Sequence, residues 1–265
     1  MKGYFIRILV ILFFITITTG VYAVRDDDLL LYLSFDEGAG VEARDSSGNE
    51  NHGVINGDVQ WTVGKSGKAL EFAGDITQYV EVPDDESLRF DDGPFTYTAW
   101  IKTYELDTAQ SQLIISKRVP VAGDGMETAS LFIKSGTDHL FVEFRDSIKG
   151  MFGYDAMDAV ITANNWHHVA WVKNDTELKF YVDGELKESV NHERDGTVNG
   201  TQPLYVGVHR YGNTWNSPFI GIIDEVAVFK AELTDAEIIQ AMNSVLAVKA
   251  TGKISGLWGR IKSDH

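Results

Sequence analysis

The chain has 265 residues, no cysteine and a formal net charge of −16. The absence of cysteine excludes a disulfide framework, a thiolate metal site and a cysteine nucleophile. The acidic balance argues against nucleic acid as a partner, because phosphate binding needs clustered lysine and arginine. Most of the acidic charges are explained by solubility, and the others are available to divalent cations.

The first segment, residues 1–23, has the pattern of a secretory signal peptide. Lys2 and Arg7 give it a positive start, and residues 8–17 are apolar. It ends at Ala23, a small residue of the kind found at signal-peptide cleavage sites. An uncleaved N-terminal anchor is the alternative, although this apolar run is shorter than the about 20 residues of a bilayer span. We therefore expect a secreted protein, extracellular or periplasmic, with no membrane span after cleavage and one folded domain over residues 24–246.

Short runs of β-branched and aromatic residues follow, separated by glycine, aspartate and asparagine turns. They predict strands at 29–35, 67–72, 78–83, 95–102, 113–116, 129–133, 140–144, 166–173, 178–182, 204–208 and 219–229. Many short strands at close spacing indicate an all-β sandwich or barrel. No segment repeats at a fixed period, which argues against a propeller or solenoid.

The stretch from residue 166 to 186 predicts the centre of the fold. Two strand-like runs flank an Asn-Asp-Thr turn, and Asp183-Gly184 suits a second tight reversal. The strand around Trp171 carries apolar residues in both alternation phases, so both of its faces are apolar. Such a strand is typical of the middle of a sheet that is covered on both sides.

One short helix is predicted near the C-terminus of the domain. Thr234 and Glu237 have the spacing of a capping box ahead of an apolar stripe. Beyond it, residues 247–265 form a basic tail with interleaved apolar residues. This tail is either a frayed terminus or an export or docking signal.

Several segments share the pattern of one family: 35–37 with 45–49, 95–100, 166–170, 181–184, 221–229 and 233–238. Together they resemble the laminin G-like jelly-roll domains of the concanavalin A-like lectin and glucanase superfamily. The resemblance covers nearly the whole chain after the signal peptide. It implies a concanavalin A-like two-sheet antiparallel β-sandwich, or jelly roll, with one short C-terminal helix. It says less about function, because one fold serves adhesion, carbohydrate binding and appended-module roles.

The resemblance also implies a structural calcium ion where the first and last strands meet. Asp224 matches the family's closing-strand aspartate, with Asp36, Asp45 and Asn49 as complementary oxygen ligands. For Asp224 the alternative is a buried carboxylate that accepts hydrogen bonds from turn amides. For Asp45 it is ordinary turn chemistry with its own backbone.

Two loops have the aromatic and polar mixture that binds sugars. They are predicted at 209–216 and 151–155, with Arg210, Tyr211, Trp215 and Tyr154 as the candidate ligand-binding residues. The alternative is that Tyr211 and Trp215 fold back as a lid on the sandwich edge.

No catalytic residue is predicted. Glu143 and Asp146 are the nearest to a paired-acid motif, but their spacing puts them on opposite faces of a strand. His168 is expected to be a satisfied core histidine. We predict a monomeric, non-catalytic binding or adhesion module for a glycan or an extracellular protein. A polysaccharide-cleaving hydrolase or lyase on the same fold, and a purely structural cell-surface protein, are the alternatives.

Overall fold

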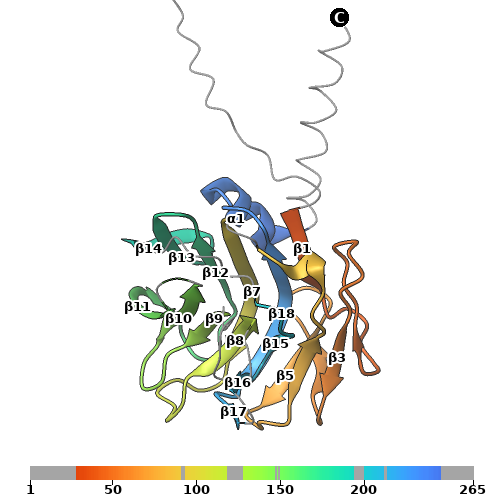
Figure 1. The fold of residues 1–265 in the computed structure, drawn as a ribbon. Helices are drawn as coiled ribbons and strands as arrows, with labels where there is room; N and C mark the ends of the chain where they lie inside the picture. Colours follow the sequence, from red (N-terminus) through yellow and green to blue (C-terminus); the bar gives the residue numbers. More distant parts are fainter. Residues whose placement is uncertain are drawn as a thin grey trace, which may run out of the picture.

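A computed structural model describes residues 28–90, 93–117, 128–146, 148, 150–193, 200–211 and 214–245. The predicted signal peptide and the basic tail lie outside these residues. The described chain forms two eight-stranded antiparallel sheets packed face to face, with one α-helix at one end (Figure 1). The predicted all-β sandwich with a single short C-terminal helix is therefore confirmed.

Sheet A takes its strands from both ends of the described chain. Its order is β14 (Glu185–Asn191), β13 (Glu177–Val182), β12 (His167–Lys173), β7 (Phe95–Thr103), β18 (Ile220–Phe229), β5 (Lys68–Ala73) and β4 (Gln60–Val63), and β1 (Leu29–Leu33) also pairs with β18. The predicted central strand, β12, lies between β13 and β7.

Sheet B faces sheet A across the core. Its order is β11 (Gly150–Val160), β10 (His139–Asp146), β9 (Thr128–Ile133), β8 (Gln112–Lys117), β15 (Leu204–Val206), β6 (Tyr79–Val82), β3 (Gly53–Asn56) and β2 (Glu42–Ala43). Three further elements lie outside the two sheets: the hairpin β16 (His209–Tyr211) and β17 (Thr214–Asn216), the 3-10 helix η2 (Glu86–Leu88) and the helix α1 (Asp235–Asn243).

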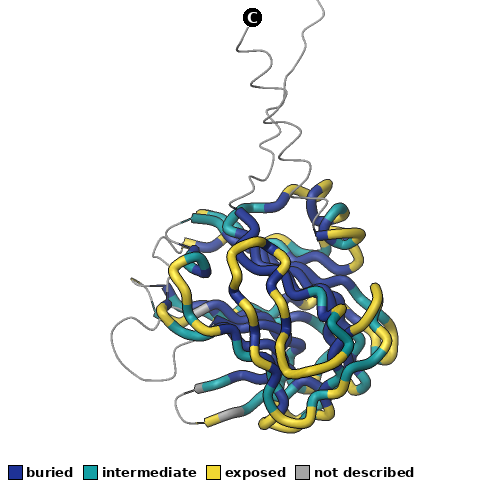
Figure 2. Tube along the Cα trace, turned by 90° about the vertical axis from the view of Figure 1, so that its right-hand side faces the viewer, coloured by how far each residue is buried: buried dark blue, intermediate teal, exposed yellow. Residues whose placement is uncertain are grey.

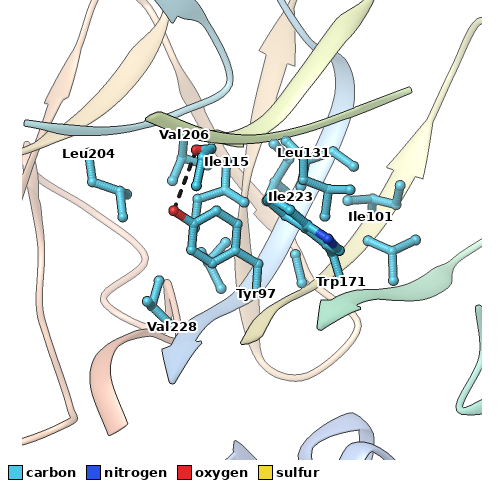
Figure 3. Packing of buried hydrophobic residues seen from close by; sticks show 14 of the residues in the cluster. Tyr97, Ile101, Ile115, Leu131, Trp171, Leu204, Val206, Ile223 and Val228 are labelled. Atoms are coloured by element: carbon cyan, nitrogen blue, oxygen red, sulfur yellow. Dashed lines mark hydrogen bonds between the residues drawn. The ribbon is translucent and has the colours of Figure 1, made fainter. Parts of the chain in front are cut away.

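The main core lies between the sheets, and the exposed backbone is mostly at the loops (Figure 2). Trp171 of β12 is fully buried there, and its ring meets Phe95 at 5.0 Å and Tyr97 at 5.7 Å, edge to face (Figure 3). Such aromatic pairs contribute about 1 kcal/mol each beyond the area that they bury. The segment predicted as the centre of the fold therefore contributes one of the largest fully buried side chains.

A second apolar cluster on the outer face of sheet A explains why β12 is apolar on both sides. Ala170 and Val172 of β12 pack there with Ile238 and Ala241 of α1. The predicted capping box begins α1: Thr234 Oγ1 accepts a hydrogen bond from the backbone N–H of Glu237, and the Glu237 carboxylate accepts one from the N–H of Thr234.

Two segments predicted as loops are strands. Residues 151–155 belong to β11, the edge strand of sheet B, and residues 209–211 and 214–216 pair as the strands β16 and β17. An edge strand buries only half of its surface, so glycine and polar residues interrupt the apolar pattern that marks a strand in sequence. A hairpin with three residues in each arm is too short to show alternation.

Candidate functional site

The outward face of sheet B carries aromatic side chains where solvent-facing sheets usually carry polar ones. Phe132 of β9 and Phe141 of β10 are cross-strand partners, and their ring centroids are 5.9 Å apart. Their chain neighbours Leu131 and Val142 point into the main core, so the two rings point away from it. With Leu113, Tyr205 and Tyr79 they form a separate cluster, which we call the outer aromatic cluster.

The β16–β17 hairpin packs on this cluster. The His209 ring lies 5.2 Å from the Phe132 ring, and the Arg210 Nη1 donates a 2.9 Å hydrogen bond to the Tyr205 hydroxyl. Phe132 and Tyr205 are consequently buried, whereas Tyr79 and Phe141 stay half-buried at the margin of the cluster. The hairpin therefore leaves aromatic surface accessible from solvent.

Burial keeps the hydroxyl groups of the two tyrosines in this cluster protonated. Burial raises the pKa of Tyr79, and the nearby Arg210 opposes that shift without reversing it. Burial likewise raises the pKa of Tyr205 against the hydrogen bond from Arg210. Their hydroxyl groups therefore stay protonated at neutral pH and are able both to donate and to accept hydrogen bonds.

A group of charged residues borders Phe141 on the same face. Asp155 is the cross-strand partner of Phe141 on β11, and its carboxylate pairs with Lys134 and with His139 Nε2. The Lys134 ammonium also lies 5.6 Å from the centroid of the Phe141 ring. These contacts fix an acidic, a basic and an aromatic group beside one another.

Arg210 is the predicted ligand-binding residue that the structure brings to this face. Tyr211 and Trp215 lie on β16 and β17, but their side chains are outside the described part of the structure. Tyr154 points between the sheets: its ring stacks on Phe180 at 5.7 Å and its hydroxyl donates to Glu188 at 2.5 Å. The structure thus does not bring Tyr154 and Arg210 together.

Sequence reasoning missed Tyr79, Phe132, Phe141 and Lys134 as site residues. The available signal was that the predicted strands at 129–133 and 140–144 each carry a phenylalanine, Phe132 or Phe141, in the alternation phase opposite to most of their apolar residues. In both strands one phase fills the core, so the aromatic residue of the other phase has to lie on the opposite face.

The predicted calcium residue Asp224 lies fully buried on β18. Its Oδ2 accepts hydrogen bonds from the backbone N–H groups of Lys65 at 2.8 Å and Ser66 at 3.1 Å, and its Oδ1 accepts one from Glu225 at 2.9 Å. Burial raises the pKa of this carboxyl to about 7, because desolvation outweighs the amide donors. This is the turn-amide alternative foreseen for Asp224.

The other predicted calcium ligands also have backbone partners. Asp36 Oδ1 accepts from the N–H of Lys68, in the same β4–β5 turn that Asp224 holds. Asp45 accepts from the backbone N–H groups of Tyr32, Ser47 and Asn51, and the Asn49 amide donates to the carbonyls of Leu29 and Leu30.

These backbone hydrogen bonds account for the carboxylates without a metal ion, whereas calcium takes six to eight oxygen ligands. Within the described ranges, no three histidine, aspartate or glutamate side chains are placed to hold a metal ion together. The calcium prediction therefore stays a prediction.

The paired histidines at the start of β12 have structural partners. His167 Nε2 accepts a hydrogen bond from the N–H of Thr162, and His167 Nδ1 lies 2.8 Å from the Asp183 carboxylate. His168 is buried beside Trp100, as predicted, and burial lowers its pKa to about 4. Contrary to the prediction it is not fully satisfied, because its Nδ1 has no hydrogen-bond partner among the described residues.

Glu143 and Asp146 lie on opposite faces of β10, as their spacing predicts. Glu143 shares the outward face with Phe141, whereas Asp146 is buried. The strand therefore does not present the two carboxylates side by side, which acid-base or nucleophilic attack on a glycosidic bond needs.

The fold and this aromatic face define the class of protein. A family model described as "Concanavalin A-like lectin/glucanases superfamily" matches residues 72–239, more than half of the chain. The chain belongs to this laminin G-like family of the superfamily. It has no significant sequence match among curated proteins.

Solved structures with the same fold include several binding domains. Domain 4 of AbnA, an extracellular arabinanase of Geobacillus stearothermophilus in complex with arabinotriose, superimposes with a TM-score of 0.63 at 22% identity, over 81% of this chain and 98% of that one. The binding domain of Paraclostridial Mosquitocidal Protein 1 gives 0.64 at 17% identity, over 83% of this chain and 52% of that one.

The receptor binding domain of a botulinum neurotoxin C/D mosaic serotype is also similar. It gives a TM-score of 0.62 at 18% identity, over 83% of this chain and 52% of that one. The chain thus spans about half the length of each toxin domain. In the described part of the chain, α1 is too short and too polar to cross a membrane.

Proposed function

We propose that this protein is a secreted, non-catalytic glycan-binding module that holds a saccharide against the outer aromatic cluster of sheet B. The observation that carries the proposal is the half-buried Phe141, with Lys134 and Asp155 fixed beside it. An apolar ring next to hydrogen-bonding groups matches a sugar, which presents C–H groups on one face and hydroxyls around its edge.

The similar structures support this choice of ligand class. One of them is described in complex with arabinotriose, and cell entry of botulinum neurotoxin type C is described as dependent on two ganglioside molecules. Both share the fold with this chain, and the partners named, arabinotriose and gangliosides, both contain sugars. We propose export through removal of residues 1–23 and a monomeric mature protein.

A glycan array followed by titration calorimetry tests the proposal. We expect Phe141→Ala to weaken binding of an array-positive glycan about tenfold, because the sugar loses its stacking ring. Phe141→Trp should retain binding. Val63→Ala is the control, because Val63 is 71% exposed and lies at the edge of sheet A.

Other outcomes would point elsewhere. Unchanged affinity in Phe141→Ala would remove the outer aromatic cluster from the binding site. Release of reducing or unsaturated sugar ends would favour a polysaccharide-cleaving enzyme. An array with no positive glycan would favour an extracellular protein partner or a structural surface role.

A further inference from the structure

The hairpin β16–β17 lies at the end of the sandwich opposite α1 (Figure 1). A depression of about 300 Å³ lies beside the foot of this hairpin. It is formed by the loop between β7 and β8 and by the segment that joins the β16–β17 hairpin to β18. Its lining residues are Glu105, Thr108, Ala109, Gln110, Gln112, Pro218 and Ile220. This volume is at the lower end of the range for small-molecule sites and is large enough for a sugar ring.

The base of the depression is held by hydrogen bonds. Gln112 is 1% exposed; its Oε1 accepts from the N–H of Ile220 at 3.0 Å, and its Nε2 donates to the carbonyl of Glu105 at 2.7 Å. Gln110 Oε1 accepts from the N–H of Ser217 at 3.0 Å, which ties the loop to the foot of the hairpin. A site built on such contacts is ordered before a ligand arrives.

Unused polar groups surround an apolar floor. Ala109, Pro218 and Ile220 supply the apolar surface. The Glu105 carboxylate is exposed and, in the described part of the chain, has no hydrogen-bond or ion-pair partner. The Gln110 Nε2 likewise makes no hydrogen bond there, because the bond to Ser217 uses only its oxygen. A carboxylate that accepts and an amide that donates match the adjacent hydroxyl groups of a sugar.

The depression adjoins the outer aromatic cluster. Gln112 lines the depression, and the next residue, Leu113, belongs to the cluster. The N–H of Leu113 donates to the carbonyl of Ser217 at 2.9 Å, so the same β8 segment and hairpin foot border both sites. A glycan chain that extends from the face of sheet B past Ser217 therefore reaches the depression.

We propose that this depression is a second subsite, which binds one neutral sugar ring of the same glycan through Glu105 and Gln110. The inference rests on the proposed glycan-binding function. It adds that recognition extends over the end of the sandwich and that the small side chain of Ala109 leaves room for the ring.

The test follows the Ile220 methyl resonance by NMR while the methyl glycosides of arabinose, galactose, glucose and N-acetylglucosamine are titrated to millimolar concentrations. We expect at least one glycoside to shift this resonance. Gln110→Glu keeps the acceptor for the Ser217 N–H but loses the Nε2 donor, and it should weaken that interaction about fivefold through one lost hydrogen bond. Ala109→Phe should abolish it by filling the depression, and Val63→Phe, the same enlargement at a distant exposed site, should not.

Phe141→Ala separates this inference from the proposed function. If the depression is a subsite, the Ile220 shift persists in Phe141→Ala, even though that variant binds longer glycans weakly. An Ile220 resonance that no glycoside moves, or that moves equally in Ala109→Phe, would overturn the second subsite while leaving the sheet-face site intact. Unchanged binding of longer glycans in Phe141→Ala would instead count against the proposed function.

Discussion

Three backbone amides hold the Asp224 carboxylate inside the protein, and protonation of this group changes the free energy of unfolding. Its pKa is about 7 in the folded protein against 3.8 for the unconstrained group. The folded state therefore binds this proton more tightly than the unfolded state does. The resulting stabilisation is complete below pH 3.8 and is lost as the pH rises through 7.

We accordingly expect the free energy of unfolding to fall by about 2 kcal/mol more in the wild type than in Asp224→Asn between pH 5 and pH 8. The asparagine amide does not titrate over this range. Urea denaturation of both proteins at the two pH values measures the difference. The comparison removes the effect of His168, which both proteins share. Parallel pH profiles would show that Asp224 is ionised in the folded protein throughout.

At the scale of single elements, α1 depends on a local contact at its first turn. The reciprocal hydrogen bonds of Thr234 and Glu237 satisfy backbone donors that the helix leaves free. A correctly started α1 places Ile238 and Ala241 on the apolar outer face of sheet A.

Thr234→Ala should therefore lower the free energy of unfolding by about 1 kcal/mol, because the cap loses its side-chain acceptor. Thr234→Ser keeps the hydroxyl and should be close to wild type. Chemical denaturation followed by tryptophan fluorescence measures both variants. If the alanine and serine variants are equally stable, the hydroxyl of Thr234 contributes nothing to the helix.

The elements that the sequence predicts well are those whose local pattern agrees with their environment. β7, β12 and β18 are buried on both faces or nearly so, and their aromatic and β-branched residues are visible in the sequence without any knowledge of partners. The Asp183-Gly184 turn was predictable because both residues adopt positive φ angles, 55° and 80°, that few other residue pairs accept.

The candidate site was harder to predict because its residues come together only through sheet order. Phe132, Phe141 and Tyr205 lie on strands β9, β10 and β15, and β15 reaches β8 only after the chain has passed through sheet A. The sequence pointed to Arg210 through its loop-like surroundings. It gave no indication that Tyr154 points into the core, because that depends on the register of β11 against β10.

For the whole molecule, the two outer faces of the sandwich have different environments. α1 covers part of sheet A, and the apolar residues of that face are sealed beneath it. The short β16–β17 hairpin covers part of sheet B and leaves Tyr79 and Phe141 half-buried. A protein that stabilises one face with a helix and leaves aromatic surface open on the other is suited to binding through the open face.

The hydrogen bonds of Asp224 also predict how the melting temperature responds to a calcium chelator. If backbone amides alone hold Asp224, a chelator has no calcium ion to remove from this strand. We therefore expect the melting temperature of the wild type to stay unchanged when a chelator is added. Asp224→Ala should melt lower with or without chelator, because it leaves the N–H groups of Lys65 and Ser66 without their acceptor. Differential scanning calorimetry measures all four conditions. A wild type that falls to the variant's melting temperature in chelator would instead establish a calcium ion at Asp224 and would require the β4–β5 turn to rearrange around it.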